Sequence, residues 1–242
     1  MRSTTLTLAA LVLGISACAK GQSAAGAAAD TTKAMAGAAA DSMKGMSGMA
    51  MDTDKAMGGS GVPTGFTAET DKPDAKITDA KYTVSGDKWE VQTGPAHIVY
   101  AAKDSASGVY AVSATIEQLE KPKHPEAYGI FFGGQHLDDR ATENYGYFLV
   151  RGTGEYLIKV RNGDKTSTVV NWKASADVPK EDASGKATYN LKVHFAPTEA
   201  HFYVNGKLVA TEPRKDVPSN GIAGLRINHN LHVSVQPVTI TK

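Results

Sequence analysis

The feature that most constrains the fold is the residue pattern that begins near Phe66. From there to the C-terminus, short runs rich in Val, Ile, Tyr, Phe and Thr are separated by Gly, Asn, Asp and Pro, which is typical of many short strands. Two connections, at 161–164 and 204–207, place Asn-Gly between strand-like runs. This dipeptide favours a two-residue type I′ hairpin, in which both central residues need a positive φ. Because no segment of helical period lies between the runs, we expect an all-β fold, a two-sheet antiparallel jelly-roll sandwich.

The strand-like runs can be placed along the chain. They predict strands at 81–85, 89–91, 97–101, 110–119, 128–133, 145–151, 155–161, 166–172, 188–195, 200–204, 208–211, 221–227 and 231–239. Trp89 follows a Gly-Asp-Lys turn, and we expect it in the core rather than at a ligand.

The residues before Phe66 have a different composition. All seven Met lie between Met1 and Met57, whereas the two Trp, nine Tyr, six Phe and seven His lie at Phe66 or beyond. From Ala19 to Gly65 the chain has no aromatic residue and too little large apolar surface to offset its chain entropy by burial. We therefore expect three parts, a signal peptide at 1–17, a tether rich in Ala, Gly and Met at 18–65, and the sandwich at 66–242.

Residues 1–18 have the pattern of a targeting signal. One Arg is followed by an apolar run from Leu6 to Ile15, which is shorter than the roughly 20 residues that a membrane-spanning helix needs. The sequence Ile-Ser-Ala-Cys at 15–18 resembles the bacterial lipoprotein signal, whose cleavage leaves a lipidated Cys at the new N-terminus. The resemblance implies a membrane anchor at Cys18, the alternative being an ordinary signal peptide with an incidental Cys. By analogy with the enterobacterial sorting rule, Ala19 in place of Asp favours a periplasm-facing lipoprotein of the outer membrane over one of the inner membrane.

The tether contains an eleven-residue repeat, at 25–35, 36–46 and 47–57. A simple spacer is the first interpretation. A weak amphipathic helix that docks on lipid or on a partner is the second, since eleven residues make about three helical turns. The third is copper binding, because thioethers are soft ligands that suit Cu(I). The candidate thioether ligands are Met43, Met46, Met49 and Met51.

Charge and cysteine usage exclude two classes of protein. The chain has 26 Lys and Arg against 25 Asp and Glu, so it lacks the basic surface on which a non-specific nucleic-acid binder depends. No nucleic-acid partner is therefore expected. The single Cys cannot form an internal disulfide, which excludes a disulfide scaffold.

Four stretches of the domain follow one another in a familiar order, YGIFFGG at 128–134, the run from 145 to 175, the run from 189 to 211, and GIAGLRI at 221–227. Together they resemble the concanavalin A-like lectin/glucanase superfamily, particularly its laminin-G-like and 3-keto-disaccharide hydrolase-like bacterial domains. The resemblance implies a jelly-roll sandwich of two curved sheets, whose concave face binds carbohydrate in some members. It does not fix an activity, because unrelated functions share such sandwiches.

The sequence lacks the spacings that common catalytic sites need. A retaining glucanase of this superfamily would carry Glu-x-Asp-x-Glu on a strand, because its two carboxyl groups must lie about 5 to 5.5 Å apart. That spacing is absent, as are a G-x-S-x-G turn and clustered His, so no catalytic residue and no cofactor are predicted. The close pair His229 and His232 is expected on a loop or surface rather than at a metal. Calcium remains a weak option for an acidic loop that contains Asp138, Asp139 and Glu143.

Strand alternation suggests a binding face. Along 145–151 it places Tyr145, Tyr147 and Arg151 on one side and apolar residues on the other. Sugars stack on aromatic rings and accept hydrogen bonds from Arg. The candidate ligand-binding residues are Tyr145, Tyr147, Arg151, Trp172, His136 and Arg140. The alternative is a set of ordinary cross-strand surface pairs.

These observations favour a lipid-anchored cell-envelope protein with a non-catalytic binding sandwich. Its expected partners are the membrane, through the lipid anchor, and either a glycan or an envelope protein. Two alternatives remain open, a glycoside-acting enzyme of the 3-keto-disaccharide hydrolase type and a structural accessory subunit of a membrane protein complex.

Overall fold

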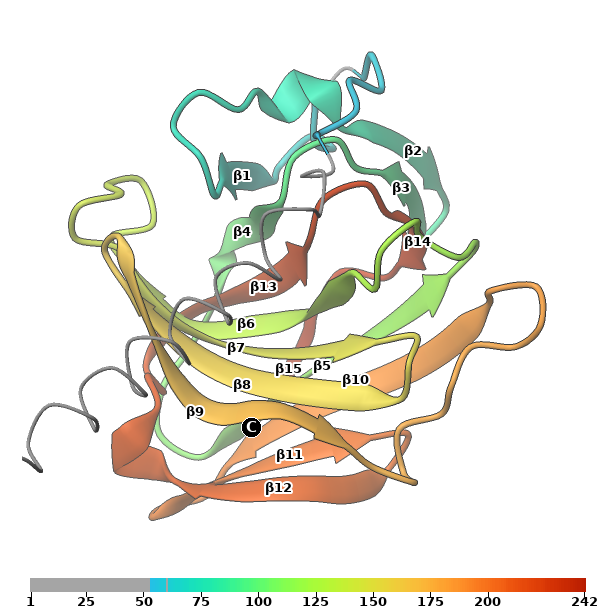
Figure 1. Cartoon of the computed structure of the whole chain (residues 1–242). Helices are drawn as coiled ribbons and strands as arrows, with labels where there is room; N and C mark the ends of the chain where they lie inside the picture. The colour runs from blue at the N-terminus through green and yellow to red at the C-terminus, as the bar shows by residue number, and fades with distance from the viewer. Residues whose placement is uncertain (1–52, 60) are drawn as a thin grey trace, which may run out of the picture. The chain divides into compact units, whose positions relative to one another are not determined.

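The structure is a computed structural model that describes residues 53–59 and 61–242 (Figure 1). The signal peptide at 1–17, Cys18, the first two repeats and the methionines at 43, 46, 49 and 51 lie outside these residues. Within the described part of the chain, no helix has the length and apolar character needed to cross a membrane.

Two antiparallel sheets form the domain (Figure 1). The seven-stranded sheet has the order β1 (Thr67–Thr70), β4 (His97–Ala106), β13 (Gly221–Ile227), β6 (Ala127–Gln135), β7 (Asn144–Arg151), β8 (Glu155–Asn162) and β9 (Lys165–Ala174). The other sheet has the order β12 (Lys207–Pro213), β11 (Glu199–Val204), β10 (Ala187–Phe195), β5 (Tyr110–Gln118), β14 (His232–Val235), β3 (Lys88–Gln92) and β2 (Lys81–Ser85), and β15 (Thr239–Thr241) also pairs with β5. Two short 3₁₀ turns, η1 (Ile77–Asp79) and η2 (Arg214–Asp216), lie in connections. The expected all-β sandwich is confirmed.

The main hydrophobic core lies between the two sheets. On β10, buried Tyr189, Leu191 and Val193 alternate with more exposed residues, as expected for a sheet that packs on one face only. Trp89 belongs to the same core and is 4% exposed, which confirms its predicted place. Each large side chain that is fully buried contributes roughly 1.5–3 kcal/mol to the hydrophobic free energy of folding.

A second apolar cluster covers the opposite face of the seven-stranded sheet. It includes Tyr100, Phe131, Tyr145 and Tyr147, with ring centroids 5.5 Å apart for Phe131 and Tyr145 and 6.0 Å apart for Tyr145 and Tyr147. The sequence expectation that the two tyrosines form an exposed binding row is therefore wrong, since they are only 1% and 5% exposed. Alternation separates the two faces of a strand correctly, but it does not tell whether the outer face is covered.

The two Asn-Gly connections form different turns. In the β11–β12 hairpin, Val204 pairs with Lys207, and Asn205 and Gly206 have φ values of 50° and 78°, as a type I′ turn requires. In the β8–β9 hairpin, Asn162 pairs with Lys165, so the turn residues are Gly163 and the residue after it. The type I′ prediction for Asn162-Gly163 is therefore displaced by one residue. Only Gly163 of these two has a positive φ, 56°, which fits a type II′ turn instead.

Most predicted strands match the structure, with two informative differences. β1 was not predicted, because its sequence TAET is short and has no large apolar residue. The predicted strand 231–239 is divided into β14 and β15, with Pro237 between them. Since Pro has no N–H group to donate to a ladder, it interrupts a paired strand.

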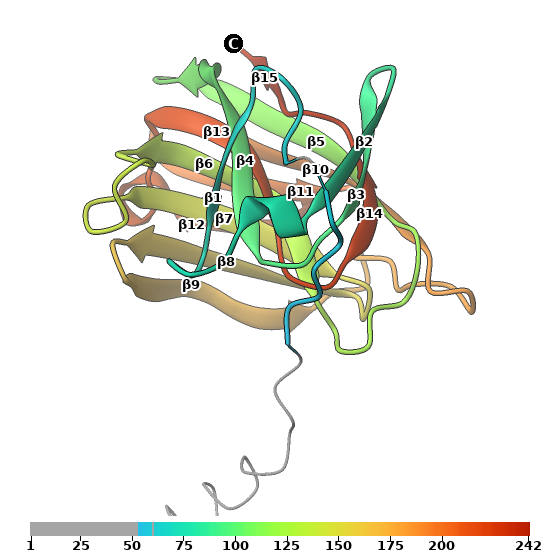
Figure 2. The ribbon, with the colours of Figure 1, turned by 90° about the horizontal axis from the view of Figure 1, so that it is seen from above.

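Contacts with the sandwich begin within the segment that the sequence assigns to the tether. The backbone N–H groups of Met57 and Gly59 donate to the carbonyl oxygens of Asp79 and Thr78, each over 2.9 Å. Figure 2 shows this part of the chain, in blue, running beside η1. We call Thr53–Gly59 the strap.

Candidate functional site

The structure brings two of the predicted binding residues together. The Arg151 guanidinium lies over the Trp172 ring, 4.2 Å from its centroid, and Nη2 of Arg151 is 2.7 Å from the Glu155 carboxylate. Tyr145 and Tyr147 are covered by the second apolar cluster. The six candidates therefore do not form one exposed face.

His136 and Arg140 lie in the β6–β7 connection, apart from Arg151 and Trp172. His136 is exposed and has a φ of 52°. Arg140 donates to the carbonyl oxygens of Asp71 and Thr70 over 2.5 and 2.6 Å. These bonds fix the connection to the end of β1, which gives Arg140 a structural contact.

The acidic residues of this connection have local partners. Asp139 accepts hydrogen bonds from Thr142 Oγ1 and Ala141 N, and these bonds hold its pKa below the ordinary value. Glu143 pairs with Arg161 over 2.5 Å, while Asp138 is exposed. Among the described residues, no group of three or more His, Cys, Asp or Glu side chains is arranged to hold a metal ion.

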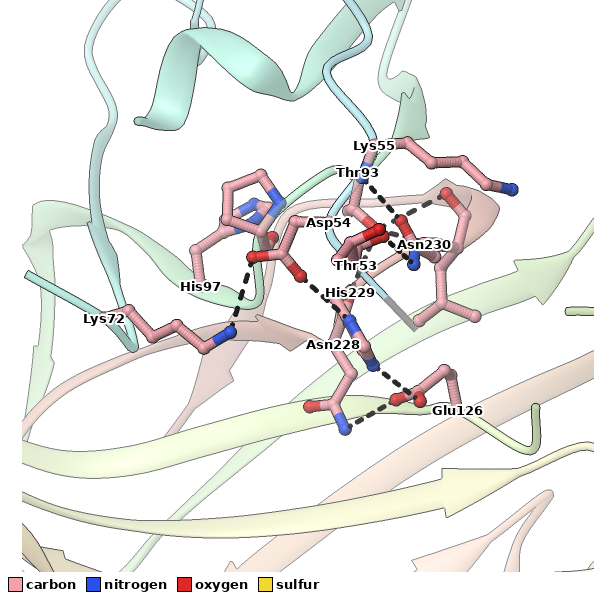
Figure 3. A network of polar contacts seen from close by, with 12 residues as sticks. Thr53, Asp54, Lys55, Lys72, Thr93, His97, Glu126, Asn228, His229 and Asn230 are labelled. Carbon is pink, nitrogen blue, oxygen red and sulfur yellow. Dashed lines mark hydrogen bonds and ion pairs between the residues drawn. The ribbon is translucent and has the colours of Figure 1, made fainter. Parts of the chain in front are cut away.

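A cavity of about 250 Å³ lies where the strap meets several loops of the sandwich (Figure 3). We call it the polar pocket. Three carboxylates and three basic side chains line it, together with Asn228 and a small apolar patch. The lining residues are Asp54, Asp71, Glu126, Lys72, Arg226, His229, Asn228, Ala75, Pro95 and Ala96.

His229 is held between two carboxylates of the polar pocket (Figure 3). Its Nε2 lies 2.8 Å from Glu126 Oε1, and its Nδ1 lies 2.9 Å from Asp54 Oδ1. The hydrogen bond to Glu126, opposed by burial and reinforced by Asp54, raises the pKa of His229 to about 9. The ring is therefore an imidazolium at neutral pH, and neither nitrogen is free to accept a proton or bind a metal.

Arg226 connects the polar pocket to the aromatic cluster beneath it. Its guanidinium binds the Asp71 carboxylate at two points, over 2.8 and 2.5 Å. It also lies 4.7 Å from the Tyr147 ring centroid and 3.2 Å from the Tyr145 hydroxyl. Burial would raise the pKa of Asp71, but Arg226 outweighs it and holds that pKa below its ordinary value. The two tyrosines thus support the pocket through Arg226.

Two residues of the polar pocket carry unmet hydrogen-bonding capacity. In the described part of the chain, Nε of Arg226 and Oδ1 of Asn228 are among the few buried side-chain polar atoms without a hydrogen-bond partner. Such a group costs about 1–3 kcal/mol when it stays unsatisfied, and it calls for a ligand, a water molecule or a local adjustment.

His97 lies behind Pro95 of the pocket lining. It is buried, with Nδ1 donating to the Pro95 carbonyl over 2.9 Å and Nε2 accepting from the Tyr82 hydroxyl over 2.5 Å. Burial lowers the pKa of His97 to about 4.

We expect His97 to contribute a free energy of unfolding that is present above pH 6.5, the ordinary histidine pKa, and lost as the pH falls toward 4. Between these two pH values His97 is protonated in the unfolded chain and neutral in the folded chain. The free energy of unfolding therefore falls by about 3 kcal/mol across this range. Urea unfolding at pH 7, 6, 5 and 4 measures it, with His97→Gln as the comparison. Parallel pH curves for the two proteins would contradict the assignment.

Sequence reasoning missed the polar pocket. The only local signal was the pair His229 and His232, which was expected on a loop or surface. His229 does lie in the β13–β14 connection, whereas His232 is the first residue of β14. The other charged residues of the polar pocket are at positions 54, 71–72, 126 and 226. They are too far apart along the chain for a sequence motif to connect them.

No protein-family profile matches the chain, and no curated protein matches it by sequence. Solved structures do match. A Bacteroides ovatus mixed-linkage glucan protein of glycoside hydrolase family 16, in complex with a product, has a TM-score of 0.52 at 9% identity, over 76% of this chain and 98% of that one. A family 16 endo-glucanase of the same organism gives 0.51 at 10% identity, over 73% and 94%. A Bacillus subtilis protein of unknown function with a galectin-like fold gives 0.52 at 11% identity, over 72% and 88%.

These similarities define the class of fold. The chain folds as a two-sheet antiparallel jelly-roll β-sandwich, which these solved structures share and which the sequence resemblance implied. At identities of 9–11%, the similarity shows the fold alone. The ligand must be inferred from the chemistry of the site.

Proposed function

We propose that the protein is a lipid-anchored cell-envelope protein whose sandwich binds carbohydrate without catalysing a reaction, with one sugar unit seated in the polar pocket. The observation that carries this proposal is the lining of the pocket, in which charged and amide groups converge around about 250 Å³ beside buried polar atoms without a partner. Two glucanases that share the fold add support from another direction.

The lining suits the chemistry of a sugar. Hydroxyl groups both donate and accept hydrogen bonds, so Glu126 can accept, Lys72 can donate, and the Asn228 amide can do either. Pro95 and Ala96 offer apolar surface to the C–H face of a ring. Small-molecule sites commonly combine a few convergent polar groups with such apolar surface.

The same contacts argue for binding rather than catalysis. A general base needs a free lone pair, whereas both nitrogens of His229 are engaged by carboxylates. A general acid must release a proton to the substrate, whereas Glu126 and Asp54 hold the proton on His229 and raise its pKa, and Arg226 holds Asp71 as an anion.

The location proposed for the protein rests on the sequence before the described residues. Cys18, preceded by Ile-Ser-Ala, would carry the lipid, and Ala19 favours the periplasmic face of the outer membrane. The tether would then hold the sandwich away from the lipid surface.

A glycan-binding assay on the purified full-length protein tests the proposed site. We expect Lys72→Ala and Glu126→Gln each to weaken binding by about tenfold or more, because a hydrogen bond to a charged group is worth about 1.5–3 kcal/mol. Lys215→Ala and Glu117→Gln are charge-matched controls on residues outside the pocket lining. Equal affinities for the pocket variants and the controls would rule out this site.

A further inference from the structure

The strap is held by the domain as an extended peptide would be. The Asn230 side chain accepts from Lys55 N over 2.9 Å and donates to the Thr53 carbonyl over 3.0 Å, so its amide pairs with the strap backbone on both sides of Asp54 (Figure 3). Asn230 itself has a φ of 52°, a left-handed conformation that Asn tolerates better than most residues. In this conformation the loop holds the Asn230 amide against the strap backbone.

Gly94 provides the close approach that the strap needs. A Cβ atom at this position would lie 2.1 Å from the Lys55 carbonyl oxygen and 2.8 Å from the Asp79 carbonyl oxygen. Any larger residue would push the strap away.

Asp54 is the part of the strap that enters the polar pocket (Figure 3). Its carboxylate lies 2.9 Å from His229 Nδ1 and 3.8 Å from Lys72 Nζ. Without Asp54, the pocket would keep the cationic Lys72, Arg226 and protonated His229 against only two carboxylates, those of Asp71 and Glu126. The remaining surface therefore has one positive charge in excess, at the place that a carboxylate now fills.

The carboxylate at position 54 is also not a property of the repeat. Position 54 is the eighth residue of the third repeat, and the equivalent positions of the first two hold Thr32 and Met43. The lysines that follow, Lys33, Lys44 and Lys55, are in register. At the eighth position of the repeat, an acid therefore appears only in the third copy, where it is Asp54 of the pocket lining.

We infer that the polar pocket binds a sugar that carries a carboxylate, and that Asp54 of the strap occupies the place of this carboxylate as an internal competitor. The inference rests on the proposed carbohydrate-binding function and names the class of sugar. Displacement is feasible because the ion pairs of Asp54 involve partly exposed side chains, and such pairs add little net stability. Only the part of the strap near Asp54 must leave, since Met57 and Gly59 are bound farther along.

Trypsin cleavage after Lys55 reports release of the strap in the full-length protein. Lys33 is the internal reference, because Lys-Ala-Met follows the same order at both sites. We expect D-galacturonate to accelerate cleavage at Lys55 several-fold relative to Lys33. D-galactose, which has a hydroxymethyl group in place of the carboxylate, should leave the ratio unchanged.

Two variants release the strap by different means. Asp54→Asn removes the charge at nearly constant size, and Gly94→Ala displaces the strap sterically while Asp54 keeps its charge. Both should bind galacturonate about fivefold or more tightly than the parent protein and should be cleaved faster at Lys55. Asp177→Asn, an exposed residue outside the pocket lining, is the matched control and should change neither value.

The outcomes separate this inference from the proposed function. If galactose binds and galacturonate neither binds more tightly nor changes cleavage at Lys55, the competitor role of Asp54 is wrong while carbohydrate binding stands. If acetate releases the strap as well as galacturonate does, the pocket recognises any carboxylate, and the inference of a sugar acid is wrong. If neither sugar binds to the parent protein or to the two strap variants, both proposals fall.

Discussion

Replacing Cys18 by Ser should move the protein from the membrane fraction to the soluble fraction. The thiol is the proposed point of lipid attachment, and each methylene group that an acyl chain buries contributes about 0.8 kcal/mol to membrane binding. Several chains on one Cys therefore anchor the protein firmly, whereas Ser offers no thiol for the lipid. Fractionation of cells that express either form, combined with metabolic labelling by a fatty acid, measures the effect.

Ser23→Ala, a small change in the same tether, is the control and should leave the protein on the membrane. A Cys18→Ser protein that stays in the membrane fraction would show that a partner holds it there. That result would favour the alternative of an accessory subunit, which co-purification in mild detergent then tests.

The second large effect is expected at the ion pair of Asp71 with the buried Arg226 in the lining of the polar pocket. Asp71→Ala should lower the free energy of unfolding by about 3–5 kcal/mol, because it leaves the Arg226 charge buried without a partner. Arg226 is only 7% exposed, and the lost carboxylate supplies two hydrogen bonds to its guanidinium. For a domain of this size each kcal/mol lowers the melting temperature by about 2–4 °C, so a fall of about 10 °C is expected in a thermal scan.

Glu155→Ala is the comparison for that ion-pair experiment. It removes the carboxylate from the Arg151–Glu155 pair, whose side chains are 22% and 23% exposed, and should cost no more than about 1 kcal/mol. The double variant Asp71→Ala with Arg226→Met should recover much of the loss, because no unpaired charge then remains. Equal losses for Asp71→Ala and Glu155→Ala would show that Arg226 does not depend on its partner.

Several features of the fold follow from local sequence alone. The Val-Asn-Gly-Lys sequence at 204–207 predicts its type I′ turn correctly, because the need for positive φ at two successive residues is met by few residue types. The alternation along β10 predicts its buried face. Both properties depend on the chain within a few residues of the position concerned.

The candidate site was less accessible to sequence reasoning. Alternation grouped Tyr145 and Tyr147 on one face correctly, yet that face is packed with Tyr100 of β4 and Phe131 of β6. Likewise, Asn162-Gly163 predicted a turn, but not which two residues occupy its central positions. Gly163 N donates to the Glu143 carbonyl over 2.7 Å, a tertiary contact that contributes to selecting the turn actually formed.

The sequence by itself determined the all-β class and most strand positions, because both depend on local periodicity and composition. Only the tertiary structure decided which polar groups meet. Asp54, Glu126 and His229 converge because the sheet order carries the strap, the β5–β6 connection and the β13–β14 connection to one end of the sandwich. Their charges then set the properties of the pocket through distances of a few ångströms, which separations of about 70 to 175 residues along the chain do not encode.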